Sequence, residues 1–354
     1  MRSWPTFPGK GSLQCGGTGR GQEGIALILA VVSVFLLTLA VFQTRAGVDL
    51  AEEIAIRNAQ EMQALYMARS GLAMVQDALV DDDKDVDSYK DDWAAANDVG
   101  AVPIAEVGWA VGKVSDEEGK FNVLDLVNDK GESDDYTDFA AQRFLDLLLE
   151  IGLSDTRAEE IVDSLIDWMD ADGTVTGAGA EEQYYTSLSH PYSCPNDVPA
   201  GIDDLTLVKG IGPVLLYQGE GEVPPLIDFV TVYGDKKPGD RFRRVNINTA
   251  PLAVISTLIP DMDPQLAEEI VASRDAEPFK TAAEIKEVPG FPDEMFNADV
   301  AGFPDDIKLA ILIDVSSEHF AATITGETAQ ASSRVYGVFE RKEGTAGLVY
   351  YRGF

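Results

Sequence analysis

Residues Ile25–Phe42 read IALILAVVSVFLLTLAVF, a run of 18 residues without a charged side chain. A helix that rises ~1.5 Å per residue covers most of a ~30 Å hydrocarbon layer over such a run. A polar, glycine-rich leader with Arg2, Lys10 and Arg20 precedes the run, and no second run of this kind follows it. The sequence therefore predicts one transmembrane helix with a large folded part on one side of the membrane.

The segment after the run predicts that this helix continues beyond the membrane. From Glu52 to Leu79 apolar residues recur at helical spacing, and Gly71 is the only breaker. A secretory signal peptide would carry a small-residue cleavage site after its apolar run, and none is convincing here. The small residue lies before the run instead, at Gly24. An ordinary signal anchor stays open as the alternative.

A glycine followed by an apolar residue and a long helix, apolar first and amphipathic later, resembles a type IV pilin-like N-terminus. The resemblance implies that a prepilin peptidase cuts between Gly24 and Ile25, and that the new N-terminus is methylated. Most pilins carry Glu at the fifth mature position, which is Leu29 here. Absence of that Glu is typical of the minor pseudopilin K family of type II secretion.

Periodicity beyond the long helix predicts a sheet in two parts with helices between them. Glu106–Leu126 has the pattern of two short strands, with the turn SDEEGK between them. Two stretches in the middle of the chain have helical patterns, Phe139–Trp168 and Pro251–Ile285. Four further strands are predicted near the C-terminus, at Ile307–Val315, Phe320–Glu327, Ser332–Glu340 and Leu348–Tyr351.

The helical block contains an internal repeat. Leu147–Asp167 aligns with Ile255–Asp275, and both segments contain the sequence AEEIV. Each unit predicts a helix, a turn with Ser154 or Asp263 as N-cap, and a second helix, which is a helix–hairpin–helix pattern. Such units often hold nucleic-acid phosphates with backbone N–H groups and nearby bases.

The hairpins of this repeat favour packing over nucleic-acid binding. Ile259–Gln265 contains two Asp, no Gly and no basic residue. Val208–Pro213 has the glycines and Lys209, but acidic residues lie near it in the sequence. We therefore expect a helical packing module and no nucleic-acid partner.

Several segments in the same order resemble signatures of the minor pseudopilin K family. In that family a helical domain interrupts a pilin-like sheet, and the match covers nearly the whole mature chain. The fold expected is α+β: a type IV pilin-like long N-terminal helix plus an antiparallel sheet, interrupted by an inserted all-α domain with helix–hairpin–helix-like repeats. The matching segments are DSLIDWMDADG (Asp163–Gly173), GAEEQYYTSL (Gly179–Leu188), LTLVKGI (Leu205–Ile211) and RVNINTAP (Arg244–Pro251).

These patterns divide the chain into a leader, an anchor, a linker and two structural parts. The predicted leader is 1–24, the transmembrane helix 25–43, and the helix extension with its linker 44–100. The pilin-like head comprises 101–128 and 303–354, and the inserted helical domain comprises 129–302.

An acidic loop after the first helical repeat is the candidate metal site. Several carboxylates on one loop repel one another unless a cation lies between them, and oxygen ligands of this kind suit Ca²⁺ better than Zn²⁺. Thr174 and Val175 stand where an EF-hand requires an oxygen ligand and a glycine, so the loop is no EF-hand. The family resemblance also implies calcium here. The candidate ligands are Asp167, Asp170, Asp172, Glu181 and Glu182.

Composition excludes several functions. The formal charge of −34 makes the chain a poor ligand for polyanions. Cys15 leaves with the leader, and a lone Cys194 excludes an internal disulfide. His190 and His319 lie in different predicted domains, and no nucleophile motif or phosphate loop is present. We expect no enzyme activity; a Cys194–His190 thiol site has nothing else to support it.

The resemblance implies a minor pseudopilin at the tip of a periplasmic pseudopilus, with the minor pseudopilins I and J as partners, supporting protein export across the outer membrane. A carboxylate in the hydrocarbon region is costly unless paired, so Leu29 fits a subunit with none ahead of it. The chain is expected in the bacterial inner membrane, single-pass, with its C-terminal part in the periplasm. A minor pilin of a surface pilus and a membrane-anchored DNA-uptake receptor remain the alternatives.

Overall fold

The computed structural model describes residues 20–104, 107–292, 294–342 and 344–354. Most of the predicted leader lies outside the described residues. The chain divides into two compact units, residues 1–60 and 61–354. The first described element, α1, is one helix from Arg20 to Asp81, which crosses from the first unit into the second. The predicted continuation of the apolar helix is therefore confirmed.

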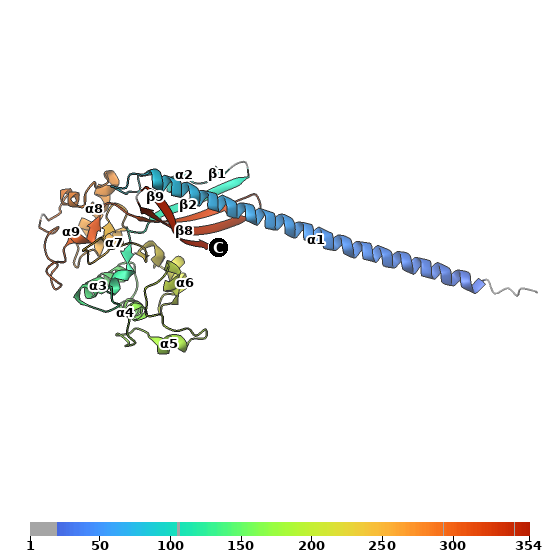
Figure 1. Cartoon of the computed structure of the whole chain (residues 1–354), viewed down its shortest axis with the longest axis horizontal. Coiled ribbons are helices and arrows are strands. Elements are labelled where there is room, and N and C mark those ends of the chain that lie inside the picture. Colours follow the sequence, from blue (N-terminus) through green and yellow to red (C-terminus); the bar gives the residue numbers. More distant parts are fainter. Residues whose placement is uncertain (1–19, 105–106, 293, 343) are drawn as a thin grey trace, which may run out of the picture. The chain divides into compact units, whose positions relative to one another are not determined.

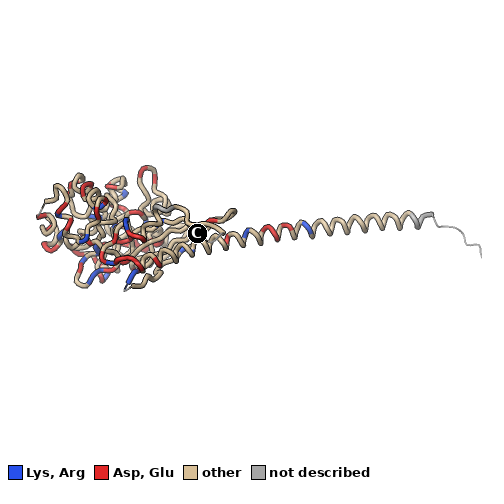
Figure 2. Tube along the Cα trace, turned by 90° about the horizontal axis from the view of Figure 1, so that it is seen from above, with Lys and Arg blue, Asp and Glu red and all other residues tan. Residues whose placement is uncertain are grey.

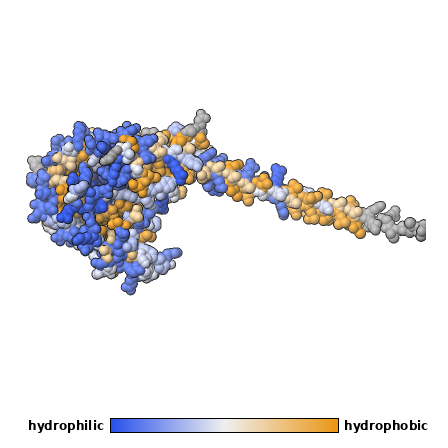
Figure 3. Space-filling view, in the orientation of Figure 1, coloured by the Kyte–Doolittle hydropathy of each residue, from blue (hydrophilic) through white to orange (hydrophobic). Residues whose placement is uncertain are grey.

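The described part of the first unit belongs to α1 and contains the apolar run of that helix. Every side chain in Ile25–Phe42 is exposed, and one 18-residue window of the helix reaches a mean hydropathy of 3.0. Figure 2 shows no charged residue on this stretch, and the face seen in Figure 3 is mainly hydrophobic. By length and composition the helix can cross a membrane.

In the second unit, the end of α1 packs on a sheet (Figure 1). The sheet has the strand order β1-β2-β7-β8-β9, with every pair antiparallel. One stripe of α1 is buried against it, at Ala64, Ala68, Leu72, Val75 and Leu79. The strands are β1 Val102–Ile104, β2 Gly108–Asp116, β7 His319–Glu327, β8 Ser332–Lys342 and β9 Thr345–Gly353.

The sheet is interrupted between β2 and β7, as the sequence predicts. The last three strands confirm the predictions for the C-terminus, with β7 one, β8 two and β9 five residues longer than predicted. Most of the elements in the block between β2 and β7 are helices (Figure 1). Its boundaries at 128/129 and 302/303 stay a prediction. Its helices are α3 Asp135–Glu150, α4 Asp155–Met169, α5 Glu182–Thr186, α6 Pro213–Tyr217, α7 Leu252–Ser256, α8 Pro264–Ala276 and α9 Leu309–Leu312.

Short helices and turns complete the chain. One α-helix, α2 (Ala96–Val99), follows the linker after α1. The 3-10 helices are η1 Asp92–Ala95, η2 Val123–Leu126, η3 Ile202–Leu207, η4 Leu226–Asp228 and η5 Ala282–Glu287.

Two strand predictions are wrong. The second strand predicted in Glu106–Leu126 is only β3 (Phe121–Asn122), which pairs in parallel with β4 (Val230–Thr231) and not with β2. The predicted strand Ile307–Val315 is mostly α9, followed by β6 (Ile313–Asp314). In both places a short apolar run is buried in the core of the helical block, where its period cannot distinguish a strand from a short helix.

The prediction of an all-α insertion is also wrong in detail, because each repeat includes short β strands. Strand β3 opens the first repeat and pairs with β4 after it, and β5 (Val245–Asn246) pairs in the same parallel way with β6. Each repeat is thus closed by a two-residue parallel ladder around a helical pair, α3–α4 or α7–α8. Asp263 caps α8 by accepting the N–H of Gln265, whereas Ser154 stands at the N-cap of α4 without a side-chain bond.

A buried polar cluster joins the block to the sheet at the end of β2. The Oδ2 atom of Asp116 accepts hydrogen bonds from Asn246 (3.0 Å), Thr249 (2.6 Å) and Ser317 (2.6 Å). Next to it, Arg341 on β8 donates to Asp87, at 2.6 Å, in the linker after α1. The predicted turn in SDEEGK is present at Glu118–Gly119, and Asp116, Glu117 and Lys120 around it are buried.

Helix α1 approaches the sheet very closely at Gly326 on β7, and a substitution there tests this packing. A Cβ atom there would lie 2.0 Å from the carbonyl oxygen of Ala64 and 2.4 Å from the nitrogen of Ala68. We expect Gly326→Ala to lower the free energy of unfolding by about 1–3 kcal/mol, because the helix has to move away from the strand. Gly347→Ala on β9 is the matched control, since its nearest contact would be 3.9 Å away. Equal denaturation midpoints for the two variants would contradict this packing.

Candidate metal centre

Three carboxylates from the predicted acidic loop meet at the end of α4. Asp167 lies in the last turn of the helix, Asp170 is its C-cap, and Glu181 is the N-cap of α5. All three residues are buried, and one oxygen from each lies within 4.8 Å of the others. The structure thus brings together residues that are up to 14 positions apart in the sequence.

The loop between Asp170 and Glu181 folds back because α4 offers it carboxylate acceptors. Oδ2 of Asp163 accepts the N–H of Ala178 at 2.7 Å, and Oδ1 of Asp167 accepts the N–H of Thr176 at 2.9 Å. These two Asp residues are four positions apart and therefore share one face of the helix. Gly179 makes the approach possible, since a Cβ atom there would lie 2.1 Å from Oδ2 of Asp167.

The carboxylates at this centre lack enough partners of their own. Both carboxylate oxygens of Glu181 and Oδ1 of Asp170 are buried without a hydrogen-bond partner in the part of the protein described. Burial, followed by the charge of the neighbouring carboxylates, raises the pKa of Glu181 to about 7 and that of Asp170 to about 6. Unpaired buried charges are costly, and a bound cation would remove the cost. Oxygen-only carboxylate ligands fit Ca²⁺.

The other two candidate ligands lie outside this trio. Asp172 is exposed, and its Oδ1 accepts the N–H of Thr174 at 2.7 Å. Glu182 is also exposed, and its Oε2 accepts the N–H of Cys194 at 2.7 Å. Their side chains hold the loops that flank the centre, and any role as ligands remains a prediction.

Lys209, in the hairpin that has the glycines, lies beside this centre. Its Nζ donates to the carbonyl of Ala178 at 2.7 Å and lies 3.0 Å from a carboxylate oxygen of Glu160. The following Gly210 has a φ of +88°, and a Cβ there would lie 2.8 Å from the side chain of Ile161. The hairpin with the glycines therefore packs against α4 and the acidic loop, which supports a packing role.

Cys194 is not an activated nucleophile. Burial and nearby carboxylates raise the pKa of its thiol to about 11, so it stays protonated near neutral pH. The hydrogen bond of His190 among the described residues joins its Nδ1 to Oγ of Ser189, at 3.3 Å. Nothing in this geometry supports a thiol enzyme.

Comparisons with known proteins identify the family. A family model described as "Type II secretion system (T2SS), protein K" matches residues 119–218, and a second with the same description matches residues 245–302. The first match contains the acidic trio. The chain is 26% identical over 275 residues to the type II secretion system protein K of Pseudomonas aeruginosa, covering 74% of this chain and 75% of that protein.

Two further comparisons cover more of the chain. The protein K of Aeromonas hydrophila is 26% identical over 337 residues, which are 91% of this chain and 94% of that protein. The fold is similar to a chain in the crystal structure of the GspK-GspI-GspJ complex from enterotoxigenic Escherichia coli, with a TM-score of 0.65 and 20% identity. That match covers 85% of this chain and 99% of the other.

These findings define the class first: a pseudopilin with an apolar N-terminal helix, which acts in protein transport as a structural subunit and not as an enzyme. Within that class, the chain belongs to the type II secretion system protein K family and is a minor pseudopilin of that system. The resemblance drawn from the sequence motifs is confirmed.

The raised pKa values predict how a cation changes stability with pH. In the metal-free protein, the pKa values of Asp170 and Glu181 are higher in the folded than in the unfolded state. Their contribution to stability is therefore present at low pH and is lost as the pH rises through about 6 and 7. Calcium at a hundredfold excess over its dissociation constant should add about 2.7 kcal/mol. We expect the difference in melting temperature between calcium and chelator to be larger at pH 8 than at pH 5.5.

Calorimetry of the full chain in detergent, with calcium or chelator, checks this expectation. Glu181→Gln should abolish the effect of calcium and raise the stability of the chelator-treated protein at pH 8. Asp172→Asn is the matched control, because that carboxylate is exposed, and it should keep most of the calcium effect. Identical melting curves with calcium and with chelator at pH 8 would contradict calcium binding at this site.

Proposed function

We propose that this chain is the tip subunit of a periplasmic pseudopilus, supporting protein export across the outer membrane. In this proposal the apolar part of α1 lies in the inner membrane as a single span, and residues 61–354 lie in the periplasm. The exposed, uncharged stretch Ile25–Phe42 supports the anchor. The insertion between β2 and β7 supports the tip position, because such a block would obstruct a subunit stacked above it.

The main support for the tip position is that residue 29 is a leucine. The side chain is exposed on α1, at the position where most pilins carry Glu. A carboxylate in the hydrocarbon region needs a partner, such as the N-terminal amine of the neighbouring subunit. A leucine removes that requirement, so this subunit needs no other subunit ahead of it.

We propose the minor pseudopilins I and J as direct partners. The complex whose chain shares this fold contains GspK, GspI and GspJ. The end of α1 keeps apolar side chains exposed at Met62, Tyr66 and Met74, and Met74 also borders a pocket lined by Ala110 and Ile324 of the sheet. An apolar stripe on a helix is the kind of surface that similar helices cover in a filament.

Calcium completes the proposal as a structural cofactor held by Asp167, Asp170 and Glu181. The unpaired oxygens of Asp170 and Glu181 support this assignment. By joining the end of α4 to the start of α5, the ion would hold the acidic loop of the inserted block in one conformation.

Processing tests the N-terminal part of the proposal. The mature protein extracted from membranes should begin at Ile25 with a methylated amine, because the prepilin peptidase cuts after Gly24. Gly24→Leu should leave the precursor uncut, as N-terminal sequencing and the larger mass would show. Gly47→Leu in the same helix is the control and should be processed normally, since nothing lies within 4 Å of either glycine. A mature start beyond residue 45 would instead indicate ordinary secretion.

Co-purification tests the partners. The full chain in detergent, mixed with the I and J pseudopilins of the same system, should elute as one complex in gel filtration. Met74→Glu should weaken the complex by placing a charge in the proposed apolar contact, whereas Asp77→Glu, which keeps its charge, should not. Leu29→Glu should permit a further subunit and change pseudopilus length, while the three-protein complex persists. Separate peaks for the three wild-type proteins at micromolar concentration would refute direct assembly.

A further inference from the structure

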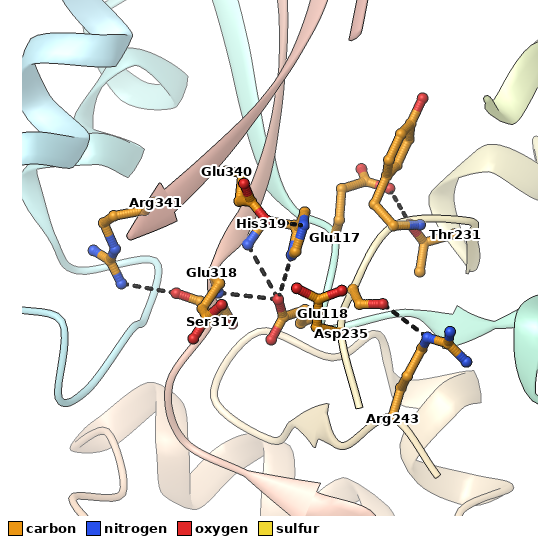
Figure 4. A network of polar contacts seen from close by, with 12 residues as sticks. Glu117, Glu118, Thr231, Asp235, Arg243, Ser317, Glu318, His319, Glu340 and Arg341 are labelled. Atoms are coloured by element: carbon orange, nitrogen blue, oxygen red, sulfur yellow. Dashed lines mark hydrogen bonds and ion pairs between the residues drawn. The ribbon is translucent and has the colours of Figure 1, made fainter. Parts of the chain in front are cut away.

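A second group of possible metal ligands lies between the sheet and the helical block, remote in sequence from the acidic loop. His319 is the first residue of β7, and Glu340 is its direct partner on β8. Asp235 comes from the segment that follows β4, and Glu118 from the turn after β2. Figure 4 shows the imidazole of His319 between the carboxylates of Glu340 and Glu118.

Glu118 determines which ring nitrogen of His319 is available as a metal ligand. Its Oε1 lies 2.8 Å from Nδ1 of His319 and also accepts the backbone N–H groups of Glu318 (3.0 Å) and His319 (3.1 Å). A carboxylate cannot donate, so Nδ1 carries the proton. In the neutral ring the lone pair is then on Nε2, which lies 3.7 Å from Oε1 of Glu340, beyond hydrogen-bond distance.

We propose that Nε2 of His319, with the carboxylates of Glu340 and Asp235, forms a binding site for a divalent transition-metal cation of the zinc class. One ligand atom from each of the three residues lies within 4.8 Å of the others. Zinc accepts imidazole nitrogen and carboxylate oxygen as ligands, and water can occupy a fourth position beside three protein ligands. A carboxylate bound to the other ring nitrogen, as Glu118 is here, commonly orients a metal-ligating histidine.

The charges around the site favour a cation. Three carboxylates surround an imidazole that is only 6% exposed. Lys342 supplies positive charge at the rim, with Nζ 2.9 Å from Oδ2 of Asp235 and 2.5 Å from Oε1 of Glu340. Its side chain is half exposed, so the ammonium can move into solvent when a metal takes its place.

This site differs from the acidic loop in both chemistry and position. The loop offers oxygen only, which suits Ca²⁺, whereas an imidazole nitrogen favours zinc-class ions. Two of the ligands belong to the sheet and one to the helical block. A metal here would therefore crosslink the two parts beside the buried cluster at Asp116.

Zinc titration tests the site. The full chain in detergent, stripped of metal and then saturated with calcium to occupy the acidic loop, should bind one equivalent of Zn²⁺ in calorimetry. Asp235→Asn should abolish tight binding, and this side chain is exposed enough to be replaced without unfolding. Glu118→Gln keeps an acceptor for the backbone but should weaken binding by about 10–100-fold. Lys342→Gln removes the competing ammonium and should strengthen binding.

The controls separate this site from adventitious binding. Asp129→Asn removes another exposed Asp that pairs with a lysine, and it should leave the zinc affinity unchanged. Co²⁺ in place of zinc should give visible absorption bands that disappear in His319→Gln, with folding of that variant confirmed by its melting curve. Failure to bind Zn²⁺ at micromolar concentration, or binding that survives Asp235→Asn, would overturn the proposal. So would weaker binding by Lys342→Gln.

Discussion

The position of the helical block on the sheet depends on one buried carboxylate, that of Asp116. It stands at the last position of β2, where the chain leaves the sheet, and it accepts hydrogen bonds from β5, from the turn after β5 and from the segment after β6. Burial raises its pKa to about 6, and the donated hydrogen bonds oppose that effect. A buried charge is tolerated when it is fully hydrogen-bonded, and its donors are then held in one arrangement.

Arg341 and Asp87 extend this constraint to the long helix. Asp87 follows α1 and is fully buried, and Arg341 donates to it. Arg341 also donates to the carbonyl of Ser317 (Figure 4). Loss of one member of a buried ion pair is far more destabilising than absence of both, so the pair ties the linker to β8. Linker, sheet and helical block therefore meet at one polar junction, and apolar packing adds to it, because Ala321, Tyr336 and Val338 of the sheet belong to the core of the helical block.

Acidic residues in this chain serve in two different ways. Most of the 61 Asp and Glu side chains keep an acidic surface hydrated. A smaller number is buried, either with enough donors, as at Asp116, or with too few, as at Glu181. A buried carboxylate without donors is where a cation stabilises the fold, and this difference separates the proposed calcium site from the junction.

The sequence by itself determined the long helix, the split sheet, the helical repeat and the family. These features depend on local periodicity and on motif order, which neighbouring residues encode. It also identified Asp167, Asp170 and Glu181, because they lie close together in one loop. Only the tertiary structure showed that Phe121–Asn122 and Ile313–Asp314 form parallel ladders with distant partners. Only the tertiary structure brings Asp235, His319 and Glu340 together, although Asp235 and Glu340 are 105 residues apart in the sequence. Contacts of this kind arise from the packing of one element on another, and packing leaves no spacing in the sequence that a pattern could reveal.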